Sequence, residues 1–187
     1  MVHMVHNGNN VELEIVLWLL KGESHLREIS RGIEISPSTV LRKINFLTAE
    51  GILDYKFIGK NKTFFIKKTI QAKNYVFNAE RYKLFKLLKK YPELEIISGQ
   101  ILNKTGKTLA VFFGSYADFS AKADSDIDIY LSTQNKKLKQ EVEGINSRLS
   151  VKTGKFELSS FLIKEIVKKH VILGGVEEFY EKIGFFN

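Results

Sequence analysis

Residues 109–131 constrain the fold more than any other stretch, because they join a buried strand, a Gly-Ser turn and a second strand that carries alternating carboxylates. The apolar run from Leu109 to Phe113 is typical of a short buried strand. Gly114 follows it directly, and a residue without a Cβ lets the backbone turn tightly and approach a ligand. Ser115 can then open a helix whose amides face a phosphate.

The second strand is expected to present its carboxylates on one face. Strand side chains alternate between faces, so Asp126, Asp128 and Tyr130 should point one way, and the core face should carry Ile127, Ile129 and Leu131. Neighbouring carboxylates repel each other unless a cation lies between them, and Mg²⁺ prefers hard oxygen ligands and also bridges substrate phosphates. The pattern therefore predicts a magnesium-dependent phosphoryl-transfer site at Asp126 and Asp128.

Residues 93–187 resemble the nucleotidyltransferases of the DNA polymerase beta superfamily, in particular the minimal nucleotidyltransferase group, which has a Gly-Ser turn and an Asp-x-Asp strand at this spacing. The resemblance implies that Gly114 and Ser115 hold the phosphates of ATP or another NTP, and that the two aspartates bind two Mg²⁺ ions. It also implies a third carboxylate on a later strand that helps to deprotonate the acceptor hydroxyl. A short strand is expected over 155–159, which makes Glu157 the candidate; the alternative is an exposed strand carboxylate without a role.

Two positions depart from the pattern of that group. Glu157 stands where the group has Asp, and its side chain is one methylene longer. Asp118 and Phe119 stand where the group usually has a basic residue followed by Gly, which bears on the turn beneath the triphosphate.

The function expected from residues 93–187 is transfer of a nucleoside monophosphate, AMP from ATP, onto a hydroxyl of a macromolecular acceptor. In the resembling group this acceptor is often a helical toxin partner. The alternative is a DNA-binding transcription regulator or antitoxin whose nucleotidyltransferase-like domain binds a ligand or partner protein without catalysis.

The excess of positive charge lies entirely in the first half of the chain. Residues 1–90 hold 16 Lys and Arg against 8 Asp and Glu, whereas residues 91–187 hold 13 of each. This asymmetry points to an anionic partner, with nucleic acid first and a membrane surface second. A solvated basic surface without a partner is the alternative.

Helices are expected over 11–21, 25–31 and from Ser36 to Gly51, with Ser36 as N-cap and Pro37 at the first helical position. A hairpin is expected over 52–67, with its turn at 59–62. With three helices followed by a hairpin that has a basic tip, residues 11–68 resemble the winged-helix domains of bacterial and archaeal transcription regulators.

In winged-helix geometry the third helix enters the major groove from its N-terminal end. Duplex DNA would then be contacted at phosphates by Ser38 and Thr39, at bases by Arg42 or Lys43, and at the backbone by Lys60 and Lys62. The alternative is a protein docking module. Phe46 is expected outside the core, where it would suit a homodimer contact.

The complete expectation is an α+β chain. It has a winged helix-turn-helix domain over 1–68, with a tail over 1–10, a helical connector over 69–92 capped at Asn78, and a polymerase-beta-like nucleotidyltransferase domain over 93–187 whose small mixed sheet is flanked by helices. The sequence contains no cysteine and no apolar run that approaches the ~20 residues of a membrane span, so we expect a cytoplasmic protein without disulfides or membrane contact. His25 and His170 are isolated, which favours structural roles.

Overall fold

The computed structural model describes residues 10–187 and shows a mixed α+β architecture, which confirms the expected fold class. The predicted tail over 1–10 lies outside the described residues except for Asn10. The chain forms two compact units. Unit 1 contains the described residues up to Ala79 together with Phe186, and unit 2 contains residues 80–185 and 187.

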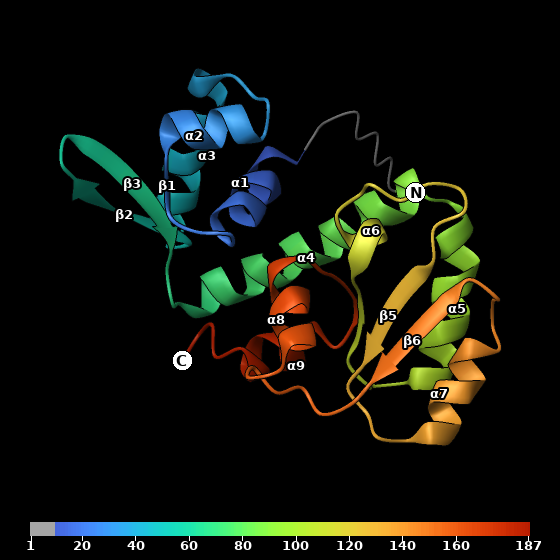
Figure 1. Cartoon of the computed structure of the whole chain (residues 1–187). Helices are drawn as coiled ribbons and strands as arrows, with labels where there is room; N and C mark the ends of the chain where they lie inside the picture. The colour runs from blue at the N-terminus through green and yellow to red at the C-terminus, as the bar shows by residue number, and fades with distance from the viewer. Residues whose placement is uncertain (1–9) are drawn as a thin grey trace, which may run out of the picture. The chain divides into compact units, whose positions relative to one another are not determined.

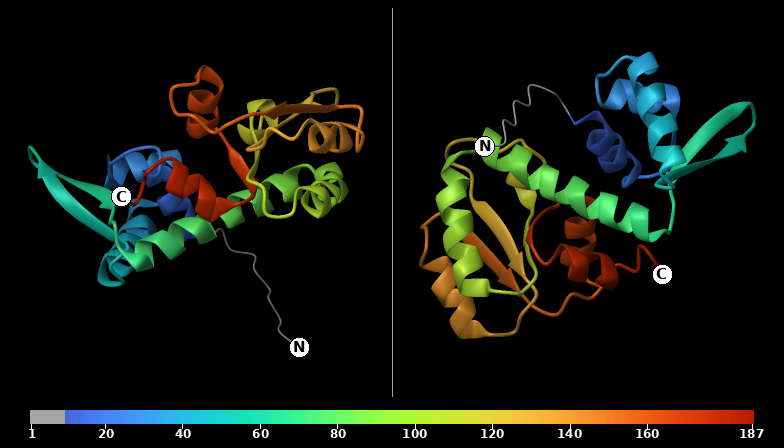
Figure 2. Two further views of the ribbon diagram at one scale, coloured as in Figure 1. Left: turned by 90° about the horizontal axis from the view of Figure 1, so that it is seen from below. Right: turned by 180° about the vertical axis from the view of Figure 1, so that it is seen from behind.

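Unit 1 combines, within residues 10–69, three helices and a three-stranded antiparallel sheet. Its elements are α1 (Val11–Leu19), β1 (Ser24–His25), α2 (Leu26–Gly32), α3 (Pro37–Ala49), β2 (Leu53–Ile58) and β3 (Asn61–Ile66), with the sheet order β1-β3-β2. The β2–β3 hairpin projects beyond the three helices in every view (Figures 1 and 2). The predicted helices and hairpin are therefore present. No sequence pattern predicts the two-residue strand β1.

Local capping sets the start of the helices in unit 1. The Ser36 side chain accepts a hydrogen bond from the Thr39 amide, and Pro37 occupies the first helical position of α3, as predicted. His25 caps α2 by accepting from the Glu28 amide, while the Glu28 carboxylate accepts from the His25 amide. The expected structural role of His25 is thus confirmed.

Helix α4 (Ile70–Lys90) begins eight residues before the predicted cap at Asn78, which lies inside it. Thr69 is the residue that caps it, because its hydroxyl accepts from the Ala72 amide at 3.1 Å and donates to the Gly51 carbonyl. The boundary between the two units falls at Ala79, within α4, whereas the sequence placed a separate connector over 69–92.

Unit 2 contains, within residues 80–185, a four-stranded mixed sheet with the order β6-β5-β4-β7. Its further elements are α5 (Glu93–Thr105), β4 (Ala110–Phe112), α6 (Gly114–Ala117), β5 (Ile127–Leu131), α7 (Lys136–Glu143), β6 (Leu149–Thr153), α8 (Phe161–Lys168), β7 (Val171–Gly174) and α9 (Val176–Lys182). Strand β4 runs antiparallel to β5 and β7, and β5 runs parallel to β6. Strand β4 is fully buried, as its apolar run predicted.

One face of this sheet forms the core of unit 2. Helices α5 and α7 lie along the same side of β5 and β6 (Figures 1 and 2). The buried side chains on that side come from α5, α7 and alternate strand positions: Leu94, Ile97, Ile101, Val142, Ile127, Ile129, Leu131, Leu149 and Val151. The opposite face of β5 carries the carboxylates.

Strand β6 corrects two predictions. The apolar spacing of Leu138, Val142, Ile145 and Leu149 predicts one helix that runs to Leu149, and the next strand is predicted over 155–159. Instead α7 ends at Glu143 and β6 occupies 149–153. The alternation of buried Leu149 and Val151 with Ser150 and Lys152 is the strand pattern that explains the difference.

A buried polar network fastens three elements of unit 2. Glu80 on α4 is 2% exposed, and its Oε1 accepts from the Tyr180 hydroxyl at 2.9 Å and lies 3.3 Å from Nε2 of His170. The other ring nitrogen of His170 lies 3.0 Å from the Ile166 carbonyl oxygen, so both ring nitrogens face acceptors. His170 therefore has the structural role that its isolation predicted.

Burial alone would raise the pKa of Glu80, but the hydrogen bond and charge of His170, with help from Lys83 and Tyr180, outweigh it and lower that pKa below its ordinary 4.5. Burial, followed by the Glu80 carboxylate, raises the pKa of Tyr180. Glu80 is consequently ionised in the folded state, inside the protein and beside an imidazole.

We predict that Glu80→Gln destabilises the chain by about 3 kcal/mol at pH 7, because it removes a buried carboxylate that accepts from the Tyr180 hydroxyl and lies beside His170. The folded-state pKa of Glu80 lies below its unfolded value, so its contribution is present above about pH 4.5 and lost as the pH falls through the folded-state pKa. Urea unfolding followed by circular dichroism at pH 7 and pH 4 checks this. A variant as stable as the parent protein at pH 7 would contradict the charged network.

Candidate active site and nucleic-acid surface

Gly114 lies directly against the Asp128 carboxylate in the candidate active site. A Cβ built on Gly114 would lie 2.5 Å from Oδ2 of Asp128, a separation that real Cβ atoms do not reach. Gly114 also has φ +65°, in the left-handed region that favours glycine. The Phe113 amide donates to the Asp128 carbonyl at 3.1 Å, so backbone pairing holds the turn beside the carboxylate.

The two aspartates lie at the start of β5. Asp126 is exposed and immediately precedes the strand, and Asp128 is its half-buried second residue. The isoleucines between and after them are fully buried on the other face, as predicted. Tyr130, two residues further along the face of Asp128, is buried, and its hydroxyl donates to the Gly154 carbonyl at 2.9 Å. The open part of this face therefore lies at the end of β5 that carries the aspartates.

The loop that joins α6 to β5 is held in place from several elements. The Ser115 carbonyl accepts from the amides of Ser120 and Ala121. Arg148, which directly precedes β6, donates to the Ala123 carbonyl at 2.7 Å. Its backbone carbonyl accepts from the Ile127 amide at 2.8 Å. No local sequence signal predicts a role for Arg148, because its contact with Ala123 spans 25 positions.

Phe119 keeps the backbone conformation that a glycine would take. Its φ is +62°, and a non-glycine residue in this region costs on the order of 1 kcal/mol. The half-buried side chain packs against the core of unit 2, and the Lys90 ammonium donates to the Phe119 carbonyl at 2.5 Å. These contacts offset the strain, so the turn keeps a left-handed residue although the sequence lacks glycine there.

Glu157 lies outside any strand, in the irregular segment between β6 and α8, and it is exposed. The predicted strand over 155–159 is therefore wrong. Phe156 packs between the rings of Tyr130 and Phe179, while Leu158 is 46% exposed. The alternation of a strand would have buried both side chains on one face. Among residues 10–187, no three His, Cys, Asp or Glu side chains are gathered closely enough to hold one metal ion together.

Strand β6 is the neighbour of the carboxylate strand. The parallel register places Ser150 beside Asp128 and Lys152 beside Tyr130. Residues paired in this way point to the same face, so the neighbouring strand offers a hydroxyl and an ammonium on the side of the aspartates. This face of β5 and β6 therefore includes the Ser150 hydroxyl and the Lys152 ammonium beside the carboxylate end of β5.

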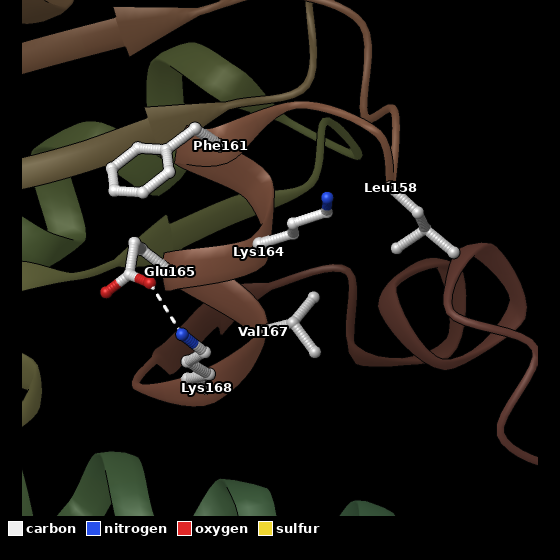
Figure 3. A pocket seen from close by; sticks show the side chains of 6 residues that line it. All are labelled: Leu158, Phe161, Lys164, Glu165, Val167 and Lys168. Carbon is white, nitrogen blue, oxygen red and sulfur yellow. Dashed lines mark hydrogen bonds and ion pairs between the residues drawn. The ribbon is translucent and has the colours of Figure 1, made fainter.

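A separate apolar groove lies at α8 (Figure 3). It encloses about 280 Å³, and its lining residues are Leu158, Phe161, Lys164, Glu165, Val167 and Lys168. Lys168 pairs with Glu165 at 2.8 Å. None of the predicted site residues lines this groove.

Helix α3 exposes part of the predicted DNA-contacting set. Ser38 and Arg42 are exposed, and Thr39 is half-buried and accepts from the Ser36 hydroxyl at 3.0 Å. Lys43 is half-buried, and its ammonium lies 2.6 Å from the Glu12 carboxylate on α1. Lys43 is thus already paired within unit 1, which leaves Arg42 as the better candidate for a contact with bases.

The β2–β3 hairpin carries cations and aromatic rings together. Lys60 and Lys62 are exposed, as predicted, and the two-residue turn at Gly59 and Lys60 is tighter than the predicted one. The Lys62 ammonium lies 3.6 Å from the centroid of the Tyr55 ring, a cation–π contact. Phe57 is 67% exposed beside them.

Phe46 is 47% exposed on α3, so its predicted place outside the core is confirmed. No helix of the described part of the chain combines the length and apolar character needed to cross a membrane. A scan against protein-family models and a search of curated proteins both found no match to this sequence.

We predict that Gly114→Ala lowers the free energy of unfolding by about 1–2 kcal/mol. The added Cβ is strained in the left-handed conformation of this residue, and it displaces the Asp128 carboxylate. Gly154→Ala is the matched control, since a Cβ there meets no atom within 4 Å. Urea unfolding measures both variants. Equal stability of the two would show that the contact between Gly114 and Asp128 is not tight.

Proposed function

We propose that unit 2 is a magnesium-dependent nucleotidyltransferase that moves a nucleoside monophosphate, AMP from ATP, onto a hydroxyl of a macromolecular acceptor. The observation that carries the proposal is the Asp128 carboxylate lying against the exposed backbone of Gly114. A phosphate chain at this turn would lie beside a carboxylate-bound cation. This is the arrangement that phosphoryl transfer requires.

The two aspartates fit a magnesium ion. Mg²⁺ is usually held by one or two carboxylates, with water and substrate phosphates completing its coordination, and Asp126 and Asp128 supply that number. When bound, the ion neutralises charge on the phosphoryl oxygens. A second ion, with Glu157 as a third carboxylate, stays a prediction, because Glu157 lies on a segment outside the sheet.

The chain's own residues have distinct parts in this proposal. Gly114 leaves room for the phosphate chain, and Ser115 follows it in the turn. Asp126 and Asp128 supply negative charge on one face of β5. Glu157 is exposed on the loop after β6, where it can meet an acceptor hydroxyl that arrives from solvent. A protein acceptor, such as a helical partner, suits a site this open.

We further propose that unit 1 is a winged helix that binds duplex DNA. The order of its helices and strands and its projecting hairpin support this, as does the excess of 11 basic over 7 acidic residues in residues 1–79. Ser38, Thr39 and Arg42 on α3 would face the major groove, and Lys60 and Lys62 would meet the backbone.

A second candidate function for unit 2 is nucleotide or partner binding without catalysis, within a DNA-binding regulator. The specific observation that favours it is the register of β6, which sets Ser150 beside Asp128. A third carboxylate on that strand would be the expected base, and its place is taken by a hydroxyl. Binding and transfer must therefore be measured separately.

We predict that Asp126→Asn and Asp128→Asn each abolish magnesium-dependent transfer from labelled ATP, assayed with cell lysate as the source of acceptor, while the circular dichroism spectrum stays unchanged. Glu157→Gln should cut turnover far more than ATP affinity if Glu157 acts as a base. Asp124→Asn is the matched control, since this exposed carboxylate lies on the preceding loop. Wild-type transfer by both aspartate variants would refute the assignment of the active site.

We predict that the chain binds duplex DNA with an affinity that falls steeply between about 50 and 200 mM salt, because neutralised phosphates release counterions. Arg42→Ala should weaken binding more than Lys43→Ala, since Lys43 is paired with Glu12. Glu12→Gln, which frees Lys43, should strengthen binding. Fluorescence anisotropy with labelled duplex DNA measures the affinity of the parent protein and of the three variants. An affinity that does not change with salt concentration would argue against phosphate contacts.

A further inference from the structure

Strand pairing brings Lys169 to the Gly-Ser turn. Strands β4 and β7 run antiparallel, with Phe112 opposite Val171. Phe112 ends β4 and Val171 begins β7, so Lys169, two residues before β7, lies at the same end of the sheet as Gly114. The Lys169 ammonium lies 3.5 Å from Oδ2 of Asp118, the residue that ends α6. A cation from the far end of unit 2's sequence thus reaches the turn where the phosphates are proposed to lie.

The ion pair between Lys169 and Asp118 is weak enough for Lys169 to exchange Asp118 for another anion. Their side chains are 68% and 32% exposed, and exposed ion pairs contribute little to stability. Asp118 has other partners, because its Oδ1 accepts from both the amide and the hydroxyl of Ser120. The Ser120 hydrogen bond is the first cause of the lowered pKa of Asp118, ahead of Lys169, so this carboxylate stays ionised when Lys169 leaves.

The negative charges around the turn would be stabilised by a cation such as the Lys169 ammonium. Asp118, Asp126 and Asp128 all lie at or near it, and a triphosphate brings further negative charge. A magnesium ion on Asp126 and Asp128 would serve one part of the phosphate chain. Lys90 donates to the Phe119 carbonyl, whereas the exposed Lys169 ammonium lies beside Asp118, where a phosphate could replace its partner.

We infer that Lys169 binds the β- or γ-phosphate of a nucleoside triphosphate at the Gly114 turn, exchanging Asp118 for the phosphate and so making the site selective for triphosphates over monophosphates. The inference rests on the proposed nucleotide site. It predicts opposite roles for the two partners of one ion pair, since Lys169 favours the bound nucleotide and Asp118 competes with it.

The test measures the affinity of the full chain for Mg·ATP and for AMP by isothermal titration calorimetry. Lys169→Ala should weaken Mg·ATP binding about tenfold and leave AMP affinity unchanged, because a charge-assisted hydrogen bond to phosphate is lost. Lys169→Arg should restore most of the affinity. Asp118→Asn should bind Mg·ATP as tightly as the parent protein or more tightly. Lys168→Ala is the matched control, an exposed neighbouring lysine that is paired with Glu165.

The outcomes separate this inference from the proposed function. If Asp128→Asn loses Mg·ATP and Lys169→Ala does not, the nucleotide site stands and the role of Lys169 is refuted. If Lys169→Ala and Asp118→Asn weaken binding equally, the ion pair is only structural, which also refutes it. If the parent protein binds no Mg·ATP, both the nucleotide site and the role of Lys169 fail.

Discussion

The missing side chain at Gly114 is the constraint on which the candidate site depends. Strand β4 must stop, turn and leave space for a carboxylate from the next strand, and only a residue without a Cβ allows the Asp128 oxygen to come this close. The antiparallel pairing of β4 with β5 brings Asp128 there, and its pairing with β7 brings Lys169. One short buried strand thus organises carboxylate, turn and ammonium.

The scaffold around this turn is rigid where the site needs it. The core of unit 2 fills one face of the sheet, so β5 can present polar groups only on the other face. The network of Glu80, His170 and Tyr180 ties α4 to the segments before and after β7. Buried hydrogen-bonded networks that include a carboxylate are costly to break, so they fix the position of the residues beside them. Lys169 directly precedes His170 and shares that support.

Local signals in the sequence were enough for much of the fold. The Ser36 cap, the buried strand β4 and the β2–β3 hairpin each follow from a few adjacent residues, and the structure confirms them. Strand β6 was missed because the apolar spacing of Leu149 also fits a helix, although the alternation after it indicates a strand. The pairing of Lys43 with Glu12 spans 31 positions, and no local pattern encodes such a contact.

The most direct measurement is a crystal structure of the full chain with Mg²⁺ and a non-hydrolysable ATP analogue. The account predicts a metal ion about 2.0–2.1 Å from carboxylate oxygens of Asp126 and Asp128, with the phosphate chain over Gly114. A nucleotide bound elsewhere, or a metal ion that contacts neither aspartate, would contradict it.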